Sequence, residues 1–115
     1  MNNERLKKLE SVSKKVIWKI IMEETQDLTE EFWIITITDI KISQDLSYLD
    51  IFVTSMKNWG LLTKALAKKN YIIQHRYNKM ISIRKLPRIR YRYDESWENS
   101  TKILETLKNI KNETI

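Results

Sequence analysis

The side chains of this chain that could do chemistry are mostly cations, and they are concentrated in one segment. Residues 56–93 contain eleven Lys and Arg residues and no Asp or Glu, whereas residues 1–55 carry a net charge of −3 and residues 94–115 a net charge of −2. Guanidinium and ammonium groups bind phosphates through charge and hydrogen bonds. Positive charge segregated in this way predicts a nucleic-acid partner.

Within the basic segment, ten side chains are the candidates for contacts with RNA. Lys68, Lys69 and Asn70 are the first choice, because we expect a break between two helices there and a helix N-terminus just after it would favour phosphate. The full set is Lys64, Lys68, Lys69, Asn70, Arg76, Lys79, Arg84, Lys85, Arg90 and Arg92. Each phosphate neutralised should make binding weaken more steeply with salt.

Two aromatic residues outside that segment leave two interpretations open. Tyr48 and Phe52 are expected on the outward side of a strand. They would either stack on unpaired bases, as aromatic residues do on the sheets of other RNA-binding modules, or form a cross-strand pair that shields the sheet.

Catalytic chemistry finds little support in the composition. The absence of cysteine excludes disulfides, thiolate metal sites and a cysteine nucleophile, and a single histidine, His75, makes a histidine-based metal site unexpected. The carboxylates Asp39, Asp45, Asp50 and Asp94 fall at a bulge, a turn, a strand and a cap, where structural roles suffice. We therefore expect no enzyme activity, no cofactor and no small-molecule substrate.

Length and hydropathy indicate one cytoplasmic domain. The 115 residues suit a single core, expected over about residues 6–109, followed by a polar tail at residues 111–115. The N-terminus has no apolar segment typical of a secretory signal, and no uncharged apolar run approaches the roughly 20 residues of a membrane span. A monomer that does not interact with membranes is expected.

The stretch KMISIRKLPRIRYRYDES, residues 79–96, links the expected fold to the charge. After Pro87, arginines alternate with Ile89 and two tyrosines, the period that places successive side chains on opposite faces of a strand. Pro87 suits the first strand position because it has no N–H to donate. Asp94 and Ser96 are good N-caps, so a helix from Ser96 to about Asn109 should follow.

The rest of the chain predicts an α+β domain. Apolar spacing indicates a helix over about residues 3–24, a polar connector over 25–31, and a strand over about 32–42 with a β-bulge near Thr38 or Asp39. A short turn leads to an antiparallel strand over 47–55. Residues 58–80 are helical with a kink at Asn70, and their apolar positions include Leu61 and Met80. The expected order is helix, strand, strand, helix, kink, helix, strand, helix, with a three-stranded sheet covered by helices on one face.

Two stretches give the chain a resemblance to the ribosome-binding factor A family. They are ITDIKISQDLSY at residues 37–48, followed by IFVT at 51–54, and RKLPRIRYRYDES at residues 84–96. The resemblance implies a KH-like fold of the second type. In this family an Ala-x-Gly signature marks the helix kink; Lys69-Asn70-Tyr71 stands there in this chain, and Gly60 is its only glycine.

The resemblance also implies a function. Such proteins are non-catalytic factors that bind the small ribosomal subunit and its rRNA late in assembly, assist maturation of the rRNA 5′ end and support growth in the cold. The alternative from the residues alone is a protein-interaction module whose basic strand pairs with an acidic protein partner.

Overall fold

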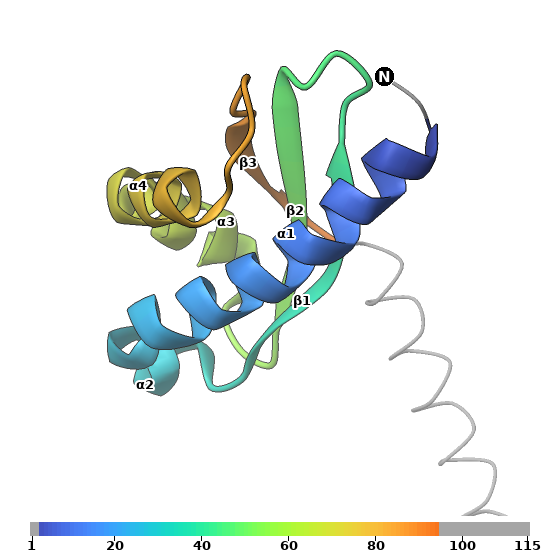
Figure 1. Ribbon diagram of the computed structural model, residues 1–115. Helices are drawn as coiled ribbons and strands as arrows, with labels where there is room; N and C mark the ends of the chain where they lie inside the picture. Colours follow the sequence, from blue (N-terminus) through green and yellow to red (C-terminus); the bar gives the residue numbers. More distant parts are fainter. Residues whose placement is uncertain (1–2, 95–115) are drawn as a thin grey trace, which may run out of the picture.

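The computed structural model describes residues 3–94, which form two layers of helices and strands (Figure 1). The elements in order are α1 (Asn3–Glu24), η1 (Gln26–Leu28), α2 (Thr29–Phe32), β1 (Ile35–Ile42), β2 (Tyr48–Ser55), α3 (Trp59–Lys68), α4 (Asn70–Met80) and β3 (Arg88–Tyr93). The predicted α+β order is confirmed as far as β3. The helix expected over 96–109 and the tail at 111–115 lie outside the described residues.

The sheet is mixed, with β2 in the centre. β1 pairs with β2 antiparallel, as the short turn predicts, and β3 pairs with β2 in parallel after the crossover through α3 and α4. Pro87 is buried directly before β3. Arg88 N donates to Ser47 O at 3.0 Å, so the hydrogen bonds between β2 and β3 begin at the first residue after the proline.

One face of the sheet is covered by helices in the described part of the chain. Leu49, Ile51 and Val53 of β2 are fully buried, while their neighbours Tyr48 and Phe52 remain exposed or half-buried. Figure 1 shows α1 crossing in front of the strands and α3 and α4 beside them. The strand period of two therefore separates an apolar, helix-facing side from an open side.

A β-bulge in β1 keeps its isoleucines on the covered side. The register with β2 shifts between Ile37 and Asp39, which confirms the predicted bulge. As a result Ile35 and Ile37 before the bulge and Ile40 and Ile42 after it are all buried. The residue in the bulge, Thr38, donates hydrogen bonds from its hydroxyl to the Phe52 carbonyl and to the Asp94 carboxylate, which ties β1 to the end of β3.

α1 has the predicted bounds and packs against α4 and β1. Ile17, Ile20 and Ile21 are buried on its inner face. Ser13, not Val12, completes that face, and the Ser13 hydroxyl hydrogen-bonds with the Tyr77 hydroxyl of α4 at 2.8 Å. Burial raises the pKa of Tyr77.

The expected strand start at Phe32 is wrong. Residues 26–32 form η1 and α2, Phe32 is completely buried at the end of α2, and β1 begins only at Ile35. Glu30 and Glu31 occupy the first turn of α2, where the helix dipole favours acidic residues. Trp33 then reverses the chain at φ 63°. Phe32, one of the aromatic residues that suggest a strand here, is instead buried at the end of a short helix.

The expected helix break is present but one residue earlier than Asn70. α3 ends at Lys68, α4 begins at Asn70, and Lys69 joins them at φ −95° and ψ 2°. Lys69 O accepts from the N–H groups of Ile72 and Ile73, both at 3.1 Å, so the backbone bonds close without a left-handed residue. Because φ is negative, the junction requires no glycine.

Leu61 and Met80 belong to the apolar pattern of residues 58–80, but the structure places both outside the core. Leu61 is 51% exposed and Met80 is 46% exposed. Each helix buries only one narrow stripe at a spacing of four residues, so residues beside the stripe face solvent. The buried pairs are Leu62 with Leu66 in α3 and Ile73 with Tyr77 in α4.

Candidate nucleic-acid interface

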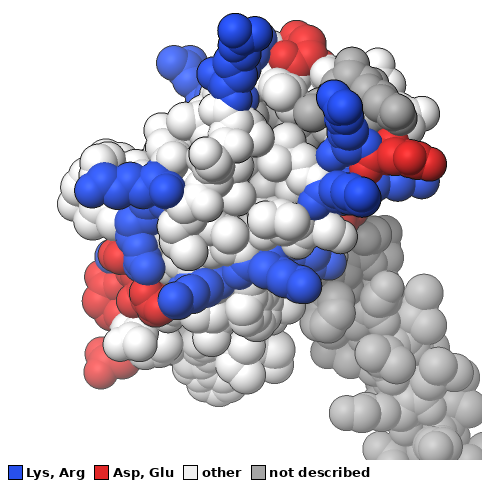
Figure 2. All heavy atoms as spheres, in the orientation of Figure 1, with Lys and Arg blue, Asp and Glu red and all other residues white. Residues whose placement is uncertain are grey.

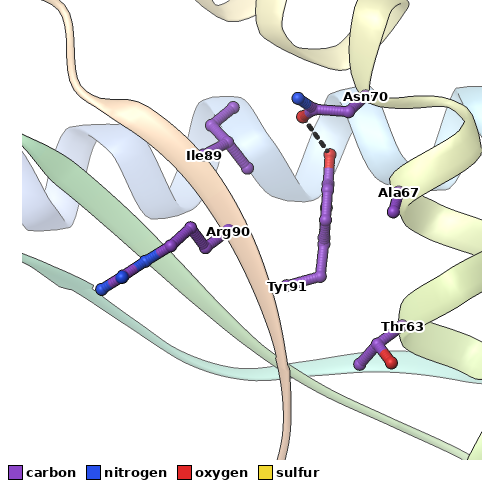
Figure 3. A pocket seen from close by; sticks show the side chains of 6 residues that line it. All are labelled: Thr63, Ala67, Asn70, Ile89, Arg90 and Tyr91. Carbon is purple, nitrogen blue, oxygen red and sulfur yellow. Dashed lines mark hydrogen bonds between the residues drawn. The ribbon is translucent and has the colours of Figure 1, made fainter.

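A shallow groove lies between α3, the α3–α4 junction and β3 (Figure 3). Its volume is about 210 Å³, and its lining residues are Thr63, Ala67, Asn70, Ile89, Arg90 and Tyr91. Thr63 and Ala67 are four residues apart on α3, so they present one helix face to the strand. Residues of the predicted kink and of the predicted basic strand therefore meet in this groove.

Tyr91 links β3 to the α3–α4 junction at this groove. Its hydroxyl donates to Asn70 Oδ1 at 2.9 Å, and Figure 3 shows the ring pointing from β3 toward the junction. Burial raises the pKa of Tyr91 above its ordinary value. The bond holds Asn70 and β3 together, and Asn70 Oδ1 is thereby engaged within the protein.

Gln74 positions the first residues of β3 against α4. Its Nε2 donates to Pro87 O at 3.1 Å, and its Oε1 accepts from Ile89 N at 2.9 Å. The amide thus satisfies two backbone groups of the strand at the point where its ladder begins. Sequence reasoning missed Gln74 because a polar helical residue gives no signal of its partner.

Lys64 and Lys68 stand beside the groove on α3. They directly follow Thr63 and Ala67 in the chain, are themselves four residues apart, and are both exposed. Neither makes an ion pair with another of the described residues. These two candidates lie on the face of α3 next to the one that lines the groove, and their exposed ammonium groups can contact phosphates there.

Three other candidate cations are hydrogen-bonded to carboxylates from residues 1–55. Arg76 reaches Glu23 Oε2 at 2.6 Å and Glu24 Oε1 at 2.9 Å, and these hydrogen bonds raise its pKa. Lys69 Nζ lies 2.9 Å from Asp27 Oδ1 and lowers the pKa of that carboxyl. Arg90 makes the third pair, with Asp50. These pairs offset part of the positive charge that the sequence segregates.

The remaining candidates are spread over several elements. Lys79 lies in the last turn of α4, and Arg84 and Lys85 are exposed in the loop before β3, where Lys85 helps to lower the pKa of Asp45. Arg92 is half-exposed, with Nε 3.7 Å from Asp50. Figure 2 shows basic side chains at several separate places, with acidic side chains beside some of them.

Arg90 and Arg92 do not point into the groove. Strand alternation sends Ile89 and Tyr91 toward the helices and the arginines to the opposite side, and Figure 3 shows the Arg90 side chain leading away from the groove. The candidates thus divide between a groove on the helix side and the open face of the sheet. Thr63, Ala67 and Tyr91 were missed as lining residues, although the four-residue spacing and the strand parity contained that signal.

Two further features bear on the classes of function. Within residues 3–94, no three His, Asp or Glu side chains come together in a way that could hold a metal ion. None of the helices in that part of the chain combines the length and apolar character that a membrane span needs.

The family model described as ribosome-binding factor A matches residues 5–107. The chain belongs to the ribosome-binding factor A family. The members of this family are non-catalytic ribosome assembly factors, so the expectation that this protein is not an enzyme is confirmed. The resemblance drawn from residues 37–54 and 84–96 is confirmed as well.

Curated relatives span nearly the whole chain. Ribosome-binding factor A of Mycoplasmopsis pulmonis is 33% identical over 113 residues, which cover 98% of this chain and 99% of that protein. Its counterpart in Halothermothrix orenii is 31% identical over 116 residues, covering 98% of this chain and 93% of the relative.

Solved structures show the same fold. The crystal structure of ribosome-binding factor A from Thermus thermophilus has a TM-score of 0.68 at 18% identity, over 76% of this chain and 93% of that one. A Thermus thermophilus homology model fitted into a cryo-EM map of a 30S complex has a TM-score of 0.57 at 19% identity, over 72% and 88%. The KH-like fold of the second type is therefore confirmed.

Proposed function

We propose that the protein binds rRNA of the immature small ribosomal subunit and promotes late maturation of that subunit in the cytoplasm, including 5′-end processing of the rRNA and growth in the cold. The observation that carries the proposal is the groove beside β3 together with Lys64 and Lys68, which are exposed on the neighbouring face of α3 and have no carboxylate partners among residues 3–94. Family membership supports it, as does the Thermus thermophilus relative fitted into a 30S complex.

The groove favours a chain-like polyanion over a small molecule. Its volume of about 210 Å³ is below the roughly 300–1,000 Å³ of typical small-molecule pockets. Exposed lysines on α3 and exposed basic residues in the loop before β3 can contact successive phosphates outside it. Lys69 and Arg76 contribute less, because Asp27, Glu23 and Glu24 already hold them.

The mechanism is selective binding rather than chemistry. A factor without a reactive group changes rRNA only by binding one conformation more tightly than another. Contacts to phosphates supply affinity and release counterions, so the bound conformation is favoured most strongly at low salt.

Charge reversal at the groove tests this function. The variant changes Lys64, Lys68, Arg84 and Lys85 to Glu, and the matched control changes the exposed α1 residues Lys7, Lys8, Lys14 and Lys15 to Glu. Both variants change the net charge equally. We expect the groove variant to stop co-sedimenting with immature small subunits while the α1 variant still does so, with circular dichroism confirming that both are folded.

Equal co-sedimentation of the two folded variants would contradict the proposal. A pull-down repeated after RNase treatment adds a second readout. If the protein acts instead as a module for an acidic protein partner, the partner survives digestion.

A further inference from the structure

The open face of the sheet carries a second set of cations and aromatic rings. In the pairing of β2 with β3, Tyr48 lies opposite Arg88, Asp50 opposite Arg90, and Phe52 opposite Arg92. On the other side of β2, Lys41 pairs with Asp50 and Asp39 with Phe52. Four cations thus share these paired positions with two carboxylates, and the excess is positive.

Arg90 is held in one orientation on this surface. Its Nε and Nη2 donate to the two oxygens of Asp50 at 2.7 and 3.1 Å, and its guanidinium carbon lies 4.0 Å from the centre of the Tyr48 ring. The hydrogen bonds to Asp50 raise the pKa of Arg90 further above its ordinary value. The guanidinium therefore lies over the tyrosine ring at cation–π distance.

Part of the Arg90 side chain remains accessible to a ligand. The side chain is 40% exposed. Asp50 takes two of the five N–H donors of the guanidinium, so the edge formed by Nε and Nη2 is engaged within the protein. A nucleobase needs none of these donors, since it stacks on the plane of the guanidinium.

The surroundings suit the rest of a nucleotide. Arg88 and Arg92 are exposed on either side of Arg90 along β3 and can contact phosphates. The Phe52 ring lies beside them with Lys41 Nζ 6.0 Å from its centre. Alternating planar and charged groups are what a single-stranded nucleic acid requires for stacked bases joined by phosphates.

We propose that the open sheet face binds unpaired RNA nucleotides, with one base stacked on the Arg90 guanidinium that Asp50 and Tyr48 hold in place. This inference rests on the proposed RNA-binding function and adds a second, base-contacting surface to it. In this arrangement Tyr48 supports the Arg90 guanidinium, and the base contacts the guanidinium rather than the tyrosine ring. That role differs from both interpretations which the sequence leaves open for Tyr48.

An oligonucleotide with removable bases separates stacking from charge. The probe is a fluorescein-labelled single-stranded RNA of ten adenosines, compared with the same length in which the four central residues are abasic. Fluorescence anisotropy measures the Kd of each. We expect the full-length wild-type protein to bind the base-containing RNA more tightly by roughly fivefold or more.

Two variants test whether the preference for base-containing RNA comes from Arg90 and its Tyr48 support. Arg90→Lys keeps the charge and removes the plane, so the ratio of the two Kd values should fall toward one while the Kd for the abasic RNA changes little. Tyr48→Leu removes the supporting ring and should lower the ratio as well. The matched control, Lys64→Gln with Lys68→Gln, should weaken the binding of both RNAs equally and preserve the ratio of the two Kd values.

The outcomes distinguish this inference from the function on which it rests. A wild-type ratio of one, or a ratio that survives both Arg90→Lys and Tyr48→Leu, overturns the base-stacking surface even if the protein still co-sediments with small subunits. Co-sedimentation that the groove variant leaves unchanged overturns the proposed function whatever the ratio is. Thermal unfolding of each variant shows that the comparison is made between folded proteins.

Discussion

The groove beside α3 and the open face of the sheet use the same basic segment in different ways. Lys64 and Lys68 border the groove as exposed point charges with no carboxylate partner among residues 3–94, whereas Arg90 on the open face is fixed by Asp50 and Tyr48. An unpaired lysine has a flexible side chain and can contact a phosphate in several positions, while a fixed guanidinium presents its plane in one direction. The difference teaches that charge count alone does not define a binding surface.

The largest expected effect comes from removing the packing under α3. Leu66 is fully buried, while Leu61 on the same helix is 51% exposed. We expect Leu66→Ala to lower the free energy of unfolding by about 2–5 kcal/mol, because it leaves a cavity. Leu61→Ala should change it by less than about 0.5 kcal/mol. Urea denaturation measures both values, and equal losses would show that α3 does not support the groove through its buried stripe.

Salt dependence sharpens the comparison at the groove. Replacing Lys64 and Lys68 by Gln should reduce the slope of log K against log salt by roughly 0.7 for each phosphate contact that is lost to single-stranded RNA. The same measurement on Arg90→Lys should leave the slope unchanged, since its charge remains. A slope that both variants alter to the same extent would mean that the two surfaces are not distinct.

A smaller effect is expected when the arginine is released on the open face. Asp50→Asn removes the anion that orients Arg90. The free energy of unfolding should fall only slightly, because solvent screens a partly exposed ion pair. The preference for base-containing over abasic RNA should weaken, while binding at the groove stays the same. An unchanged preference would show that Tyr48 alone holds the guanidinium.

The smallest effect lies at the turn that leads into Tyr48. Hydrogen bonds from Ser47 and Ser43 lower the pKa of Asp45 from 3.8 to about 2. A lowered pKa in the folded state stabilises the protein above pH 4, and this contribution is lost as the pH falls from about 4 to about 2. Urea titrations at a series of acidic pH values should show that Asp45→Asn flattens this part of the profile, with no change in the ratio of RNA affinities.

Local patterns predicted much of this fold. The apolar spacing of α1 predicted both of its ends, and the change of parity among the isoleucines predicted the bulge near Thr38 or Asp39. The alternation after Pro87 also predicted which side chains of β3 face the helices. Each of these features depends on neighbours within a few residues, so the sequence alone contains the information.

Interactions between distant residues were not predictable in the same way. The pairs of Arg76 with Glu23 and Glu24 and of Lys69 with Asp27 join segments more than forty residues apart. No periodicity marks such partners, and they remove charge from a segment whose sequence is uniformly basic. Phe32 shows a related limit, because tertiary burial places it in a helical turn against the preference of its neighbours for a strand.

The junction at Lys69 has a consequence for how the family can diverge. Its φ of −95° does not require glycine, and the hydrogen bonds that close the corner are made by main-chain atoms, whereas the Lys69 side chain pairs with Asp27. Selection is therefore free to vary the side chain at this corner while the course of the chain stays the same. The glycine of the Ala-x-Gly signature falls two residues after Lys69, where this chain has Tyr71, so a search that demands that glycine would overlook a chain that forms the same corner without it.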